Sequence, residues 1–120
     1  MAVASDANQA VEQRRAQLSS ELQRFVTIIT ARMRPERIII FGSFATGRIK
    51  EWSDLDLVVV ARTDLPFYQR LDHIYRSVEP QVGLDVLVYT PEEWADLTAT
   101  RRFVQEEVVE KGRVLYERPC

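Results

Sequence analysis

The spacing of apolar and polar residues along this chain predicts first a long helix. From about residue 6 to residue 33, apolar residues recur at steps of three and four, which is typical of an amphipathic helix. These residues are Val11, Leu18, Leu22, Phe25, Val26, Ile29 and Met33. The charged residues expected on the opposite, solvent side are Glu12, Arg14, Arg15, Glu21 and Arg24. Pro35 follows, where a helix commonly stops.

Three short apolar runs predict strands. Arg37–Phe41 is almost continuously apolar, so we expect this strand to be covered on both faces. The second run covers residues 55–61, and the third is Leu84–Tyr89, preceded by the punctuating residues Pro80 and Gly83. Residues 114–116 are predicted to add a short edge strand.

Turn and capping signals predict the remaining helices. Gly42-Ser43 ends the first strand, and residues 44–48 are expected to form a short helical turn. Residues 65–78 place their apolar side chains on one face and predict another helix. Thr90-Pro91-Glu92-Glu93 predicts a helix start, with Thr90 as the N-cap and Glu93 closing the capping box. A last helix is expected over residues 99–111, ending at Gly112.

Composition limits the classes of protein. The 120 residues, 46% hydrophobic and 28% charged, are enough for one core, so we expect a single domain over residues 1–120. A net charge of −2 argues against a dedicated nucleic-acid binder, which would be basic over a whole face. No run is long enough to cross a bilayer, and the first residues lack the pattern of a signal peptide. We therefore expect a cytoplasmic protein that does not interact with membranes.

The single cysteine and the single histidine exclude several kinds of site. Cys120 alone cannot form an internal disulfide or a zinc cluster. His73 alone cannot supply a site that needs several imidazoles, and because it lies in a charged helix we expect it at the surface or at the boundary of the core. Candidate chemistry must therefore come from other residue types.

Two aspartates inside an apolar strand are the most unusual feature of the sequence. Aspartate is depleted in strands and costly to bury unless it is paired or bound to a cation. In Ser53-Asp54-Leu55-Asp56-Leu57, side-chain alternation places Asp54 and Asp56 on one face, about 7 Å apart. Two carboxylates so placed favour a hard cation such as Mg²⁺ over a solvated face.

Two further features point to phosphoryl chemistry. Gly42-Ser43 follows a buried strand and opens a helical segment, where a phosphate can approach the backbone closely; the alternative is a plain turn. Asp85 repeats the anomaly of an aspartate in an apolar strand, although a strand-end carboxylate is the alternative. If the two strands are neighbours, Asp85 completes a trio with Asp54 and Asp56. Two metal ions roughly 3.5–4 Å apart could then orient a triphosphate and activate a hydroxyl.

The order of these motifs resembles a known family. Gly42-Ser43, ten intervening residues, Asp54-Leu55-Asp56 and a later strand aspartate resemble the DNA polymerase β-like nucleotidyltransferases. Within that superfamily, the run 40–47 followed by 53–56 is similar to the minimal nucleotidyltransferases, which include antitoxins paired with HEPN-type toxins. The specific part of the resemblance covers residues 37–89, and the finish Gly112-Arg113-Val114-Leu115-Tyr116-Glu117 is also similar.

The resemblance implies a fold and a reaction. It implies an α/β (α+β) core of two or three layers whose mixed sheet is flanked by helices. Asp54, Asp56 and Asp85 would be the catalytic residues and would bind two Mg²⁺ or Mn²⁺ ions. The expected reaction moves a nucleoside monophosphate, AMP from ATP, to a hydroxyl and releases pyrophosphate. The implied partner is a HEPN-type helical toxin encoded nearby, in a hetero-oligomer or dimer, with a tyrosine as acceptor.

One departure from the family leaves alternatives open. Relatives often carry Arg-Gly after the Gly-Ser turn, where this chain has Thr46-Gly47. Arg48 is the predicted replacement, together with Gly42 and Ser43 as nucleotide-binding residues, and Lys50 is a second candidate. The alternatives to a protein-modifying enzyme are an antitoxin that acts by binding alone and a small-molecule nucleotidyltransferase. The small-molecule nucleotidyltransferase is disfavoured because such enzymes usually carry a further helical domain.

Overall fold

The computed structural model describes the backbone of residues 2–119 and the side chains of residues 7–119. Cys120, the basis of the prediction about disulfides, lies outside the described residues. The helices are α1 (Ala2–Met33), α2 (Ser43–Thr46), α3 (Phe67–Val78) and α4 (Pro91–Thr100), followed by the π-helix η1 (Val104–Glu110). The strands are β1 (Arg37–Phe41), β2 (Leu55–Val60), β3 (Leu84–Tyr89) and β4 (Arg113–Glu117).

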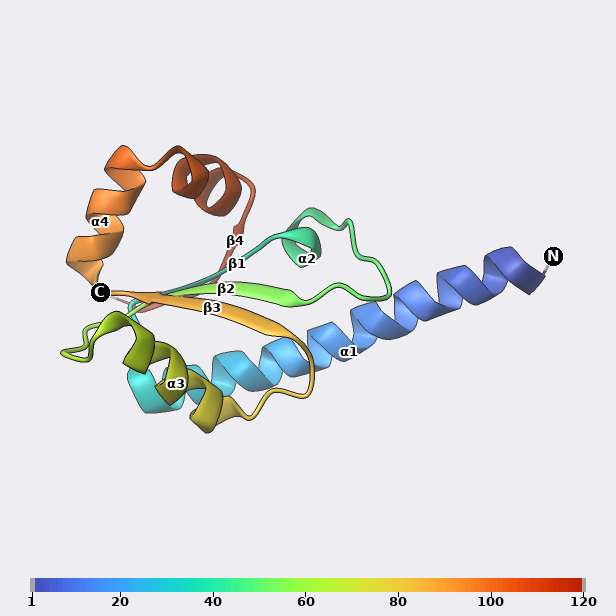
Figure 1. Ribbon diagram of the computed structural model, residues 1–120, viewed down its shortest axis with the longest axis horizontal. Coiled ribbons are helices and arrows are strands. Elements are labelled where there is room, and N and C mark those ends of the chain that lie inside the picture. The colour runs from blue at the N-terminus through green and yellow to red at the C-terminus, as the bar shows by residue number, and fades with distance from the viewer. Residues whose placement is uncertain (1, 120) are drawn as a thin grey trace.

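The four strands form one mixed sheet in the order β3-β2-β1-β4. β1 runs antiparallel to both β2 and β4, whereas β2 and β3 are parallel. Helices cover both faces of the sheet, α1 and α3 on one and α4 with η1 on the other (Figure 1). The predicted α/β fold with a mixed sheet flanked by helices is therefore confirmed, and it has three layers.

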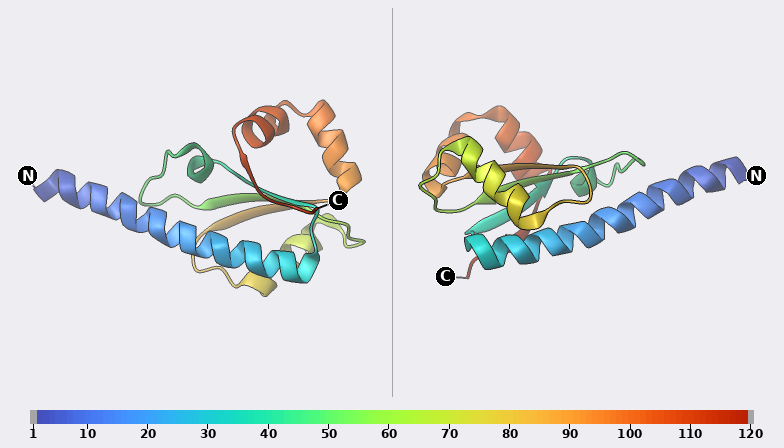
Figure 2. Two further views of the ribbon diagram at one scale, coloured as in Figure 1. Left: turned by 180° about the vertical axis from the view of Figure 1, so that it is seen from behind. Right: turned by 60° about the horizontal axis from the view of Figure 1, so that its bottom comes forward.

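The face under α1 and α3 carries the larger apolar core. Alternate strand residues point into it, and Leu18, Phe25 and Ile29 of α1 are at most 1% exposed. The packing of this long helix follows from its three- and four-residue apolar steps. The N-terminal part of α1 runs out beyond the sheet, past the end at which α2 lies (Figures 1 and 2).

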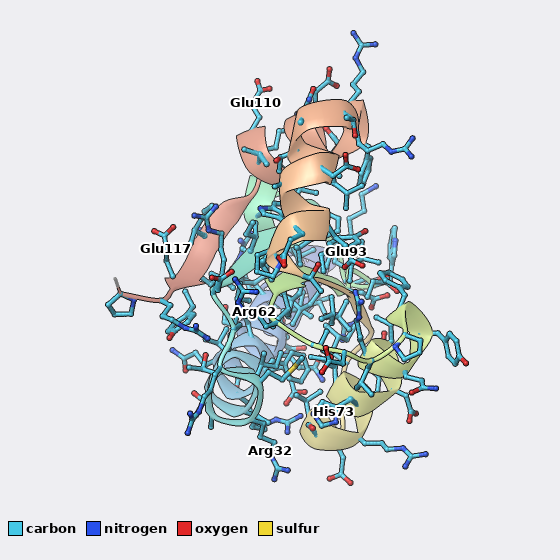
Figure 3. The ribbon with its side chains drawn as sticks, turned by 90° about the vertical axis from the view of Figure 1, so that its left-hand side faces the viewer. Arg32, Arg62, His73, Glu93, Glu110 and Glu117 are labelled. Atoms are coloured by element: carbon cyan, nitrogen blue, oxygen red, sulfur yellow. The ribbon has the colours of Figure 1, made fainter. Side chains whose placement is uncertain are left out.

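The opposite face carries a smaller core of Ile39, Val58, Val60, Trp94, Val104 and Val108. The capping box predicted at Thr90 is present and starts α4. Glu93 of that box also accepts a hydrogen bond of 2.6 Å from the buried Arg70 of α3, so it links two helices. Figure 3, which views the end opposite to α2, shows Glu93 at the start of α4 and His73 on α3. His73 is exposed, as expected.

Two helix predictions differ from the structure. The helix predicted over residues 65–78 begins only at Phe67, because a residue before proline is disfavoured from helical geometry, and Leu65 precedes Pro66. The single last helix predicted over residues 99–111 is wrong. Arg101 adopts an extended conformation and ends α4, and η1 starts separately at Val104. Both segments can then pack on the same face of the sheet, through Trp94 and through Val104 with Val108.

The length and hydropathy of the helices bear on membranes. Among the residues that the structure describes, no helix combines the length and the apolar character that a bilayer span requires.

Candidate active site

The sheet topology brings the predicted motifs together at one end. Phe41, the last residue of β1, is paired with Asp56 near the start of β2, and Asp56 is paired with Asp85 near the start of β3. The Gly42-Ser43 turn follows β1 directly, so it lies at the same end of the sheet. In Figure 1 this is the end of the sheet at which α2 is drawn. The fold thus explains why motifs up to 43 residues apart belong to one site.

Gly42 is required at the turn for two reasons. Its backbone has φ 78° and ψ −158°, a region open essentially only to glycine. A Cβ atom there would also lie 2.2 Å from Oδ2 of Asp56, closer than real contacts allow. The glycine therefore lets the backbone approach the carboxylate, and the short helix α2 begins at the next residue, Ser43.

Asp56 and Asp85 place two carboxyl groups side by side on neighbouring strands. Burial raises the pKa of Asp56 to about 6, and the neighbouring charge of Asp85, a hydrogen bond with Asp85 and the charge of Asp54 act in the same direction. Asp85 itself is exposed on the edge strand β3. Burial and the two neighbouring carboxylates together disfavour the ionised form of Asp56.

Asp54 is held differently, by a residue from α1. The Arg14 guanidinium lies 3.1 Å from Oδ1 of Asp54 and donates a 2.7 Å hydrogen bond to the carbonyl oxygen of Ser53. The side chain of Asp54 is half exposed, whereas that of Arg14 is 18% exposed. Gly83 makes room for this carboxylate, since a Cβ at Gly83 would lie 2.3 Å from its Cγ. Arg14, expected on the solvent side of its helix, instead turns toward the site.

A polar cavity of about 390 Å³ adjoins the turn. It is lined by Gly42, Ser43, Thr46, Arg48, Glu107 and Lys111. The three predicted nucleotide-binding residues thus share one cavity, and its size falls within the range of small-molecule sites. Lys50, the other candidate cation, lies instead over the ring of the exposed Trp52, 5.5 Å from its centroid.

The three aspartates do not form a ready-made metal site. Among residues 7–119, no three Asp, Glu, His or Cys side chains are grouped closely enough to hold an ion. Asp56 lies beside Asp85 on the neighbouring strand, and Asp54 is turned to Arg14. The donor set is nevertheless all oxygen and carries uncompensated charge, which fits a hard divalent cation. Asp54 would have to leave Arg14 to join it.

A second cavity, of about 440 Å³, lies at the other end of the sheet. Arg37, the first residue of β1, lines it together with Glu36, Trp94 and Glu117. It contains none of the three aspartates and no glycine turn. We therefore assign the candidate site by its chemistry to the smaller cavity and the adjoining carboxylates.

Four contributors to the site were missed in the sequence. Arg14 and Glu107 lie on helices distant in sequence and Lys111 directly follows one, and charged residues on or beside an amphipathic helix carry no signal of what they face. Gly83 was recognised only as punctuation before a strand. The signal that could have drawn attention to it is its place directly before a strand aspartate.

Comparison with known proteins agrees with this geometry. The family model described as polymerase beta, nucleotidyltransferase, matches residues 23–119. A search of curated protein sequences found no match. A solved structure of a Sulfolobus solfataricus protein assigned to the nucleotidyltransferases is similar, with 17% identity and a TM-score of 0.66 over 91% of this chain and 88% of that chain.

Two toxin–antitoxin structures share the fold. One was solved with AMP-PNP; it has 18% identity and a TM-score of 0.51, covering 80% of this chain and 73% of that one. The other is a mutant of the pair MntA–HpeT, with 18% identity, a TM-score of 0.52 and coverages of 80% and 72%. At these identities the likeness concerns the fold. Because the family model spans most of the sequence, this chain belongs to the polymerase β-type nucleotidyltransferase family.

Proposed function

We propose that this protein is an antitoxin of the minimal nucleotidyltransferase type, which transfers AMP from ATP to a tyrosine hydroxyl of a HEPN-type toxin and releases pyrophosphate. The observation that carries the proposal is the Asp56–Asp85 pair, which lies directly beside the Gly42 turn and its cation-lined cavity. The fold shared with two toxin–antitoxin structures, one of them with AMP-PNP, supports the same class of partner and nucleotide.

Different residues of the site would bind the phosphates and accept the proton. Gly42 and Ser43 would bind phosphate oxygens through the backbone and the Ser43 hydroxyl, with Arg48 as a neighbouring cation. The attacking hydroxyl would lie between this turn and Asp85. Asp85 is exposed on an edge strand, so a partner protein can reach it, and its carboxylate would accept the proton of that hydroxyl.

Asp54, Asp56 and Asp85 would hold Mg²⁺ or Mn²⁺, two ions when all three take part. When bound, such ions neutralise triphosphate charge and lower the pKa of an attacking hydroxyl. The raised pKa of Asp56 supports this assignment, since the carboxyl pair lacks a compensating cation among the described residues.

A second function is favoured by one specific contact. Asp54 is paired with Arg14, and the described side chains hold no ready group of three ligands. An antitoxin that neutralises its partner by binding alone would need no metal ligands. Thr46, where relatives often have arginine, points in the same direction.

Co-expression with the product of the neighbouring gene and intact mass spectrometry separate the two functions. We expect the partner to gain the mass of AMP, and Asp56→Asn and Asp54→Asn to abolish the gain. A tight complex that protects cells without modification, equally well in both variants, would reject transfer and support binding alone.

A further inference from the structure

The end of η1 lies close to the end of β1 because of a close contact made by Gly112. A Cβ at Gly112 would lie 2.2 Å from the carbonyl oxygen of Val108 and 2.8 Å from that of Ile40. Only a residue without a side chain allows the end of η1 to approach the end of β1 this closely. The preceding residue, Lys111, is thereby brought to the cavity beside Gly42 and Ser43.

Lys111 enters this cavity from a different element than Arg48 does. Arg48 follows α2, whereas Lys111 follows η1, and both line the cavity. Nζ of Lys111 lies 2.7 Å from Oε2 of Glu107, and this hydrogen bond raises the pKa of the lysine. An ammonium group has three donors, so one bond to Glu107 leaves others free to bind a ligand.

The lining indicates which part of a nucleotide the cavity accepts. Its side chains are hydroxyls and charges, from Ser43, Thr46, Arg48, Glu107 and Lys111, and none is aromatic. Such a lining suits phosphate oxygens better than a base. Gly42 separates the cavity from the carboxylates, because it contacts Asp56 and lines the cavity as well.

We propose that Lys111, which lines the cavity together with Arg48, binds the β- and γ-phosphates of the nucleoside triphosphate. This inference rests on the proposed function, because AMP transfer puts the reacting α-phosphate beside the aspartates and leaves the pyrophosphate portion for the cavity. Glu107 is a positioning residue that holds the ammonium group at the cavity.

The test compares nucleotides that do and do not carry the outer phosphates. Binding of ATP, AMP and inorganic pyrophosphate is measured by calorimetry, with Mn²⁺ present, for the wild type and for Lys111→Met. We expect the Kd for ATP and pyrophosphate to rise about ten- to a hundredfold and the Kd for AMP to change less than about twofold. Lys111→Arg should restore ATP binding. Lys50→Met, which removes the lysine over Trp52, is the matched control and should change nothing.

The positioning role of Glu107 has its own readout. Glu107→Gln keeps the shape of the side chain and removes its negative charge. Lys111 then loses its ion pair, and the cavity becomes more positive. We expect ATP affinity in this variant to depend more steeply on salt than in the wild type. An unchanged salt dependence would overturn this role.

The outcomes separate this inference from the proposed function. Unchanged ATP and pyrophosphate affinity in Lys111→Met, while AMP transfer to the partner continues, overturns the role of Lys111 alone. Loss of ATP affinity in that variant without any transfer by the wild type supports the role of Lys111 and rejects transfer. A wild type that binds neither ATP nor pyrophosphate overturns both.

Discussion

At the scale of single residues, the site depends on charge that the protein leaves uncompensated. Asp56 is half-buried beside Asp85, and together they hold negative charge that the described residues do not neutralise. Functional sites commonly retain such destabilising groups. The consequence can be measured as a dependence of stability on pH.

Asp56→Asn should raise the free energy of unfolding of the metal-free protein. The pKa of Asp56 is about 6 in the folded protein, against an ordinary value of 3.8 for an aspartate. The ionised carboxylate therefore lowers stability above about pH 6, and this loss disappears as the pH falls from about 6 toward 4, because the folded protein binds the proton first. After allowance for solvent screening we expect a gain of about 1–2 kcal/mol near pH 7 and almost none near pH 4.

Urea unfolding of the wild type and the variant in EDTA, at both pH values, measures this difference. Unfolding of the Asp56→Asn variant at neutral pH would instead assign Asp56 a structural role.

Gly42→Ala should be more damaging than the same change at Gly47. Both glycines have positive φ, 78° and 79°, but a Cβ at Gly47 has no atom within 4 Å, whereas one at Gly42 meets the Asp56 carboxylate. We expect a loss of about 1 kcal/mol for Gly47→Ala and about 2–4 kcal/mol for Gly42→Ala, measured by thermal unfolding.

Repeating Gly42→Ala in an Asp56→Ala background isolates the contact. Part of the loss should then be recovered. Equal losses in the two backgrounds would mean that only the backbone conformation, and not the carboxylate, requires the glycine.

At the scale of the elements, the sequence predicts the features that depend on local pattern. It does not predict which residues tertiary contacts bring together. The bounds of β1 and β3 and the capping box at Thr90 were predicted correctly, since each is a local signal. Among the site residues, Gly42, Ser43 and Arg48 do share a cavity, and Asp56 and Asp85 are paired. Arg14 and Lys111 could not be found, because only the packing of helices against the sheet brings them to the site.

The contact between α1 and Asp54 predicts competition with a metal ion. A guanidinium 3.1 Å from Asp54, a carboxylate that we propose binds a metal ion, repels a second cation. Arg14→Gln should therefore tighten Mn²⁺ binding by a few-fold, about 3- to 10-fold, and lower stability by about 1 kcal/mol. Arg15→Gln is the matched control, because Arg15 is paired with Glu12 along the same helix.

Titration of Mn²⁺ followed by electron paramagnetic resonance checks both variants. Weaker Mn²⁺ binding in Arg14→Gln would mean that Arg14 positions Asp54 as a ligand instead of competing for it.

At the scale of the whole molecule, the site is open at one end of a three-layer domain. Asp85 is on an edge strand, Gly42 and Ser43 follow β1, and α1 runs past the same end (Figures 1 and 2). A partner protein can therefore approach the carboxylates without rearrangement of the core. We expect these parts to act as one site because ATP binding should require a divalent cation.

Calorimetric titration of ATP in Mg²⁺ and in EDTA tests that link most directly. In Mg²⁺ we expect saturable binding that is lost in EDTA and in an Asp56→Asn/Asp85→Asn double variant, because the aspartates otherwise repel the triphosphate. Equal ATP affinity in Mg²⁺ and EDTA, unchanged in the double variant, would contradict the assignment of these carboxylates to a metal-dependent nucleotide site.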